Sequence, residues 1–178
     1  MFQEVINFWF EQVEPSQWWT KDDEFDQLIT HKFSDAHEQA VRCELFEWRA
    51  YPQGRLAEII ILDQFSRNMF RGTPKAFSQD KMALILAQEA ISLGIDKLLR
   101  PKERGFVYLP LMHSESIAIH ETAEAIYRQC GDQSSLTFEL KHKKIIERFG
   151  RYPHRNEILG RDSSEEEIEF LKLPGSSF

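Results

Sequence analysis

The chain has 178 residues, of which 42% are hydrophobic and 29% are charged, and its net charge is −7. These values are typical of a folded globular protein and exclude a globally disordered chain. The negative charge disfavours binding to nucleic-acid phosphates, and no apolar stretch approaches the roughly 20 residues that span a bilayer.

The N-terminus and the cysteines indicate a soluble protein in a reducing, cytoplasmic location. The segment MFQEVINFWFEQVEP contains acids and lacks the basic region of a signal peptide. Cys43 and Cys130 show neither CxxC nor metal-ligand spacing. We therefore expect no membrane contact, no metal site and no cofactor.

Helical periodicity dominates the N-terminal half. Apolar residues recur at intervals of three and four in 2–13, and a second helix is expected after a cap at Asp22 and Asp23. A segment around Ala40 either continues this helix or kinks from it. The helix predicted over 54–69 is apolar on nearly every side and should be central and buried.

The C-terminal half continues the helical pattern. Ser78 is predicted to cap a helix that runs to Leu93 and ends at Gly94. Pro101 is expected to open the next helix and Pro110 to bend the chain. Further helices are predicted over 114–130, over 136–149 and, after a capping-box pattern, over 163–171.

This pattern of helices and short loops predicts an all-α fold of about eight helices in antiparallel hairpins. No convincing strand pair and no long linker interrupt it. We expect a single helical domain over 1–178, with residues 172–178 as a frayed tail.

Basic residues concentrate near the C-terminus. The segment Lys141–Arg161 carries seven Lys and Arg residues and two acids. Gly150, Pro153 and Gly160 predict tight turns at helix ends, where backbone N–H groups lack intrahelical partners and attract anions. The pattern favours a pocket for an anionic ligand. The alternative is internal charge pairing or a solvated face.

A second polar cluster ends the most apolar helix. Gln64, Arg67 or Asn68, and Arg71 share one face at helical spacing. They either line the floor of a pocket or are satisfied pairwise, as Asp63 with Arg67 would be. Asp80, just beyond Ser78, reads as a first-turn acid that the helix dipole favours.

The histidines supply candidates for acid–base chemistry. His113 and Glu115 follow Pro110 at the expected bend, where irregular backbone often carries function. The alternative is that Ser114 caps the next helix and His113 only flanks it. His142 lies on an apolar helix face and is more readily a core residue, whereas His31 and His37 are expected at the surface.

Four motifs carry a resemblance to a known family: FWF (8–10), LDQFSRNMFRGTPKAFSQD (62–80), LPLMHSE (109–115) and HKKIIERFGRYPHRNEILGRDSSEEE (142–167). With these the chain resembles the bacterial family catalogued as domain of unknown function 924. The resemblance implies an all-α fold of the tetratricopeptide-like superhelical class and no particular activity. Its pattern falls on Asp63, Gln64, Arg67, Asn68, Arg71, Asp80, His113, Glu115, His142, Arg148, Arg151, His154, Arg155, Asn156, Gly160 and Arg161.

The sequence predicts a protein that binds an anionic small molecule, with its enzymatic character left open. His113, Glu115 and His154 are the candidates for proton transfer. The predicted ligand-binding residues are Gln64, Arg67, Asn68, Arg71, His142, Arg148, Arg151, Arg155, Asn156 and Arg161. The main alternative is a tetratricopeptide-like module that grips a protein segment. RNA binding through the basic segment and a purely structural role of both clusters rank below these.

Overall fold

The protein is helical throughout the residues that its structure describes, 1–177. This structure is a computed structural model, and it contains no strand in that range, which confirms the all-α prediction. The backbone groups into two compact units. Unit 1 comprises Met1–Arg71 and Lys75–Pro110, and unit 2 comprises Gly72–Pro74 and the chain from Leu111 onward. The single domain and the tetratricopeptide-like stacking stay predictions.

Unit 1 contains the first five α-helices and most of the sixth. Their bounds are Phe2–Asn7 (α1), Asp23–Val41 (α2), Pro52–Ile60 (α3), Ser66–Met69 (α4), Asp80–Ser92 (α5) and Pro101–Met112 (α6). Two π-helical segments, Phe8–Gln12 and Ile61–Phe65, continue α1 and join α3 to α4. Short 3-10 turns cover Gln17–Trp19, Phe46–Ala50, Pro74–Phe77 and Ile95–Leu98.

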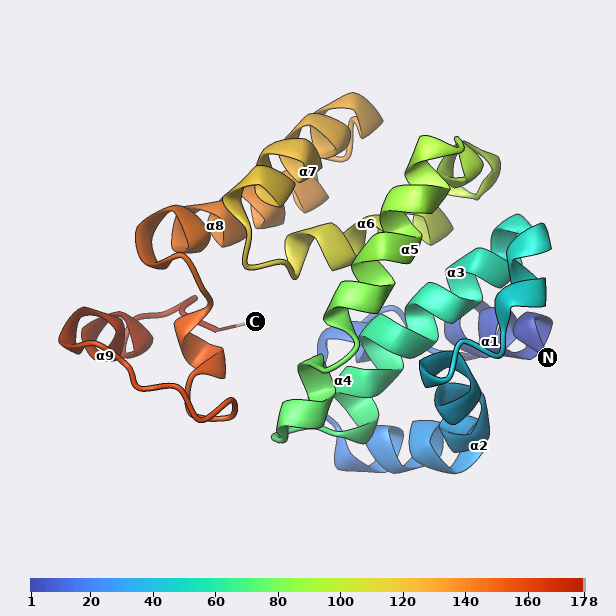
Figure 1. Ribbon diagram of the computed structural model, residues 1–178, viewed down its shortest axis with the longest axis horizontal. Helices are drawn as coiled ribbons and strands as arrows, with labels where there is room; N and C mark the ends of the chain where they lie inside the picture. The colour runs from blue at the N-terminus through green and yellow to red at the C-terminus, as the bar shows by residue number, and fades with distance from the viewer. Residues whose placement is uncertain (178) are drawn as a thin grey trace. The chain divides into compact units, whose positions relative to one another are not determined.

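The rod formed by α3, its π-helical continuation and α4 is the centre of unit 1 (Figure 1). Every residue from Leu56 to Ser66 is buried, which confirms the predicted central helix. The Phe65 ring lies 5.4 Å from Trp9 and 4.9 Å from Phe33 between ring centroids. These aromatic contacts tie the rod to the first helices of the chain and give the unit a large apolar core.

Three expectations for unit 1 are corrected. The first helix changes to π-helical geometry at Phe8, because its hydrogen bonds widen by one residue there. Ser78 does not cap α5: its hydroxyl donates to the Lys75 carbonyl, and α5 begins at Asp80. His37 is buried rather than at the surface, because its Nε2 lies 2.9 Å from the hydroxyl of buried Ser66.

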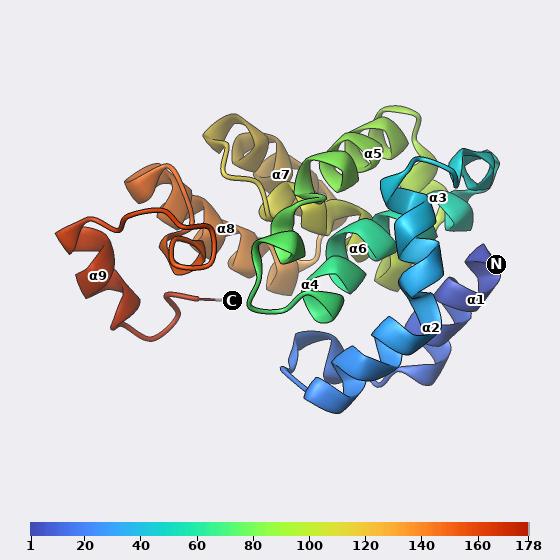
Figure 2. The same cartoon turned by 60° about the horizontal axis from the view of Figure 1, so that its bottom comes forward.

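Unit 2 is built on a helical hairpin. Helices α7 (Ile117–Cys130) and α8 (Gln133–Phe149) pack against each other and are joined by a two-residue turn that includes Gly131 at φ 72°. Figure 2 shows the pair side by side, followed by the irregular chain that leads to α9 (Glu165–Leu171). A single 3-10 turn, Pro153–Arg155, interrupts that irregular chain.

Helix boundaries in unit 2 differ from the predictions by about one turn. Pro110 lies inside α6, and the break falls after Met112, so α7 begins at Ile117 rather than Ser114. Helix α8 begins at Gln133 because Asp132 accepts hydrogen bonds from the N–H groups of its first turn. The capping box before α9 is confirmed. Of the predicted frayed tail 172–178, residues 172–176 form turns and bends, and residue 178 lies outside the described residues.

Candidate functional site

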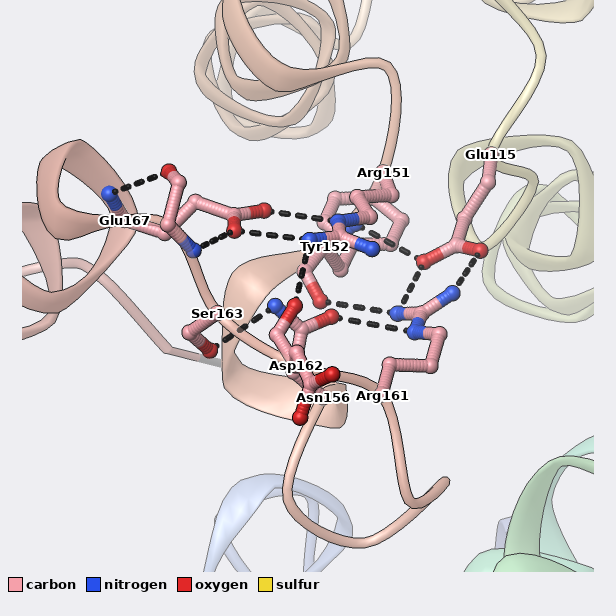
Figure 3. A network of polar contacts seen from close by, with 9 residues as sticks. Glu115, Arg151, Tyr152, Asn156, Arg161, Asp162, Ser163 and Glu167 are labelled. Atoms are coloured by element: carbon pink, nitrogen blue, oxygen red, sulfur yellow. Dashed lines mark hydrogen bonds and ion pairs between the residues drawn. The ribbon is translucent and has the colours of Figure 1, made fainter.

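The basic run between α8 and α9 is held in tight turns, as its glycines and proline suggest. Gly150 ends α8 at φ 67° and Gly160 adopts φ 64°, a left-handed conformation that costs glycine little. Pro153 starts the 3-10 turn between them. The run therefore folds back on itself and brings Arg161 to Glu115, just before α7, and Arg151 to Glu167 of α9 (Figure 3).

Arg161 forms a two-pronged ion pair with Glu115, which lies just before α7. Its two terminal nitrogens are 2.7 and 2.9 Å from the Glu115 oxygens, and its Nε donates to the Asn156 side chain at 3.0 Å. The Tyr152 N–H also donates to Glu115 at 2.8 Å. Burial alone would raise the pKa of Glu115, but the hydrogen bonds from Arg161 and Tyr152 outweigh it and lower that pKa.

Arg151 and Arg148 make comparable contacts with α9. Arg151 forms two bonds of 2.7 Å to Glu167, the acid of the capping box, and lowers the pKa of Glu167 to about 2. Arg148 pairs with Glu166 at the surface, with 2.7 Å between nitrogen and oxygen. Arg148, Arg151 and Arg161 thus each meet a carboxylate of this chain, which is the internal charge pairing that the sequence left open as an alternative.

Tyr152 is fully buried in unit 2 and contacts several polar groups there. Its hydroxyl donates to the Met112 carbonyl at 2.6 Å and lies 3.2 Å from Nε2 of His120. That Nε2 is also 2.8 Å from the Ser114 carbonyl, which can only accept, so Nε2 carries a hydrogen. Nδ1 of His120 is 2.7 Å from Glu139, and both side chains are fully buried. Burial raises the pKa of Glu139, although its hydrogen bond with His120 opposes this shift.

Arg155 and further histidines surround the Tyr152 ring. The guanidinium carbon of Arg155 lies 4.6 Å from the ring centroid, and the rings of His142 and His154 lie 5.8 and 5.6 Å away. His142 donates from Nδ1 to the Phe138 carbonyl at 2.8 Å. Burial, together with the nearby His113, His120 and His154, lowers the pKa of His142 to about 3, although the hydrogen bond to the Phe138 carbonyl opposes this shift. Unit 2 therefore gathers one guanidinium and several imidazoles around one aromatic ring.

The second predicted cluster lies in unit 1 and is satisfied by acids of that unit. Arg67 forms two bonds to Asp80, at 2.8 and 3.0 Å, and lies 3.2 Å from Asp63. Asp63 also accepts from the Gln64 side chain at 2.5 Å. The predicted pair of Asp63 and Arg67 is therefore present, and Asp80 has a specific partner besides its place in the first turn of α5.

Arg71 and Asn68 share one carboxylate. Arg71 donates to both oxygens of Asp26, at 2.5 and 2.8 Å, and Asn68 donates to the same group at 2.7 Å. Asp26 comes from α2 and received no role in the sequence reasoning. The sequence hardly distinguishes Asp26 as an ion-pair partner, because it is one of several acids in the first turn of a capped helix.

The sequence also gave no role to Glu139 and did not pair Glu167 with Arg151. Glu139 and Glu167 are 0% and 3% exposed. Their burial was not predicted, because the sequence pattern of their helices marks only the apolar residues as buried. Asn156, by contrast, was predicted as a site residue and is fully buried, where its side chain donates to Ser163 at 3.0 Å. A carboxylate at the inner edge of an amphipathic helix is the signal that could have found Glu139.

Among residues 1–177, no group of three or more His, Cys, Asp or Glu side chains is arranged to hold a metal ion. No helix in the same range combines the length and the apolar character needed to cross a membrane.

Comparison with known proteins gives a family and a fold relative. The family model described as bacterial protein of unknown function (DUF924) matches residues 5–175. A solved structure of a protein of unknown function from Agrobacterium tumefaciens is 38% identical, with a TM-score of 0.91 and 96% of each chain covered. The comparison with curated proteins found no match.

Proposed function

The chain belongs to the bacterial family of unknown function DUF924, and for this member we propose that unit 2 binds an anionic small molecule. The observation that carries the proposal is the guanidinium of Arg155 held 4.6 Å from the Tyr152 ring, with histidines on the same ring. A guanidinium fixed on an aromatic face keeps its N–H fork oriented for carboxylate or phosphate groups. Imidazoles beside it add hydrogen-bond donors and acceptors.

In this proposal the paired arginines position the site rather than contact the ligand. Arg161 and Arg151 fasten the two ends of the turn 152–160 to Glu115 and Glu167. Fully buried Tyr152 and Asn156 fix its interior. A turn held at both ends loses little entropy when a ligand binds, so these contacts favour affinity indirectly.

If the bound anion is a substrate, His113 or His154 is the residue that transfers a proton. Both are partly exposed, whereas His120 and His142 are buried. The ion pair with Arg161 and the lowered pKa of Glu115 make that carboxylate a weak proton donor near neutral pH. Of the three candidates from the sequence, the histidines therefore suit acid–base work better.

The proposal is tested by the thermal stability of the protein with phosphate, pyrophosphate and citrate. We expect at least one of these anions to raise the Tm of the wild-type protein and of Arg148→Ala, because Arg148 is a surface ion-pair partner. Arg155→Ala should lose that increase and Arg155→Lys should keep part of it. An equal increase in Arg155→Ala and wild type, or none with any of the anions, overturns the proposal.

A second candidate function has its own observation in unit 1. A groove of about 340 Å³ is lined mainly by apolar atoms of Phe2, Ile6 and Tyr51, and the Phe2 and Tyr51 rings stack at 5.4 Å. Tyr51 is 57% exposed, and an open apolar groove of this kind suits an inserted protein segment. A partner that is retained by wild type and Trp19→Ser but lost with Tyr51→Ser supports this alternative.

We also propose a cytoplasmic location. Cys43 is an exposed thiol outside any disulfide, and reducing compartments preserve such thiols.

A further inference from the structure

Unit 2 carries a groove whose lining residues differ from the arginine and histidines around Tyr152. Its volume is about 330 Å³, and it lies between α8 and the turn after α9. Lys141, Lys144 and Ile145 line it from α8, and Phe170, Pro174 and Gly175 line it from the other side. Its volume is at the lower end of the range found for small-molecule sites.

The floor of this groove is apolar and held in place. Ile145 is 6% exposed, and the Phe170 ring packs on the Phe149 ring at 5.0 Å between centroids. The Arg148 guanidinium covers the same two rings, at 4.7 and 5.7 Å. A preformed apolar surface of this kind can take an alkyl or aryl group without first rearranging.

Its two lysines differ from the other bases of the run. Among residues 1–177, neither Lys141 nor Lys144 forms an ion pair, whereas Lys143 is paired with Glu124 at 2.7 Å. Two acids of α9 pair with other bases, Glu166 with Arg148 and Glu169 with Lys172. Positions 141 and 144 are three residues apart on α8, and the Lys141 ammonium lies 5.4 Å from the centroid of the exposed Phe138 ring.

We propose that this groove binds a small amphiphilic anion, a carboxylate attached to a short alkyl or aryl group. The apolar floor takes the hydrocarbon part, and Lys141 and Lys144, which form no ion pair within residues 1–177, attract the carboxylate at the rim. This complementarity of charge and polarity selects against inorganic anions, which leave the floor uncovered, and against neutral amphiphiles, which leave the lysines without a counter-charge. Its lining residues differ from those of the anion site proposed around Tyr152, but Ile145 and Phe170 pack in the same core cluster as Tyr152.

The test is a titration of the full chain with octanoate, acetate and 1-octanol, followed by the amide resonances of residues 141–145 and 170–175. Octanoate should shift these resonances with an affinity about tenfold or more above that for acetate or octanol, since each probe lacks one of the two contacts. Lys141→Gln/Lys144→Gln should weaken octanoate binding about fivefold, because two exposed charge contacts are lost.

The control is Lys81→Gln/Lys97→Gln, which removes two exposed lysines of unit 1 and should leave the affinity unchanged. Arg155→Ala should bind octanoate like wild type, which separates this site from the one around Tyr152. Equal responses to octanoate and acetate, unchanged affinity in the double lysine variant, or resonance shifts confined to other residues overturn the proposal.

Discussion

Arg161 illustrates how a charged side chain can serve the fold and prepare a site at once. It bridges Glu115, the Asn156 side chain and the Tyr152 carbonyl, and its side chain is 25% exposed. Forked contacts of a guanidinium with a carboxylate fix geometry as well as charge. At this scale, three arginines of the basic run, Arg148, Arg151 and Arg161, are neutralised by carboxylates of the same chain.

The sequence located these side chains but not their partners. Glycines and a proline place Arg151 and Arg161 in tight turns, and this prediction required only local rules. Their carboxylate partners come from distant positions, Glu115 and Glu167, and nothing in the spacing of charges selects them from the other acids. Charge pairs across long sequence separations depend on packing, which a single sequence does not reveal.

The lowered pKa of buried His142 predicts that the stability of the protein depends on pH. Burial lowers its pKa from 6.5 to about 3 in the folded protein, while the unfolded chain keeps the ordinary value. Between those two pH values the unfolded chain binds a proton that the folded chain excludes. The free energy of unfolding should therefore fall as pH decreases below 6.5, by up to about 1.4 kcal/mol per pH unit from this residue.

The measurement is urea unfolding between pH 7 and pH 5 for wild type and His142→Gln. The variant should lose most of this slope, because glutamine cannot take up the proton. His31→Gln, at an exposed position on α2, is the matched control and should keep the wild-type slope. Identical slopes in wild type and His142→Gln would show that the buried imidazole does not cause the dependence.

Side-chain caps fix where several helices of this protein begin. Asp22 and Asp132 each accept hydrogen bonds from two backbone N–H groups and start α2 and α8. The sequence identified the first cap because an acid precedes a clear apolar period, and missed the second because serines around it suggested a loop. It also assigned a cap to Ser78, whose hydroxyl turns back to the preceding turn instead. Short polar side chains form both kinds of bond, and the choice depends on the backbone.

The two caps give a paired prediction at the scale of one helix. Asp22→Ala should lower the free energy of unfolding by about 1 kcal/mol, because two N–H groups of α2 lose their acceptor. Ser78→Ala should change it by less than about 0.5 kcal/mol, because no helix N–H group depends on that hydroxyl. Chemical denaturation of both variants measures this difference, and a larger loss in Ser78→Ala would contradict the observed start of α5.

The central rod shows what periodicity cannot resolve. Its apolar run predicted a buried helix over 54–69, and the structure has one from Pro52 to Met69. The π-helical part, Ile61–Phe65, leaves no mark in that pattern, because a widened turn shifts register by only one residue. Asp63 and Gln64 lie in this part, so the polar cluster of unit 1 is set by a local backbone irregularity.

For the whole molecule, composition and periodicity sufficed to predict an all-α protein, and four sequence motifs carried the family resemblance. They did not reveal the two compact units, because no composition change marks the passage near Pro110. The net charge of −7 would oppose an anionic ligand at long range. Binding must therefore depend on local groups, which makes Arg155 and its neighbouring histidines the decisive residues of the account.

The most direct test follows the histidine side chains by NMR while phosphate, pyrophosphate or citrate is added. We predict that the imidazole resonances of His113 and His154 shift to saturation with at least one anion in wild type and in Arg148→Ala. In Arg155→Ala the shifts should be reduced about tenfold or more at equal concentration, because the charge-bearing contact is lost. Imidazole resonances that stay unchanged while an anion binds, or equal shifts in Arg155→Ala and wild type, would contradict an anion site around Tyr152.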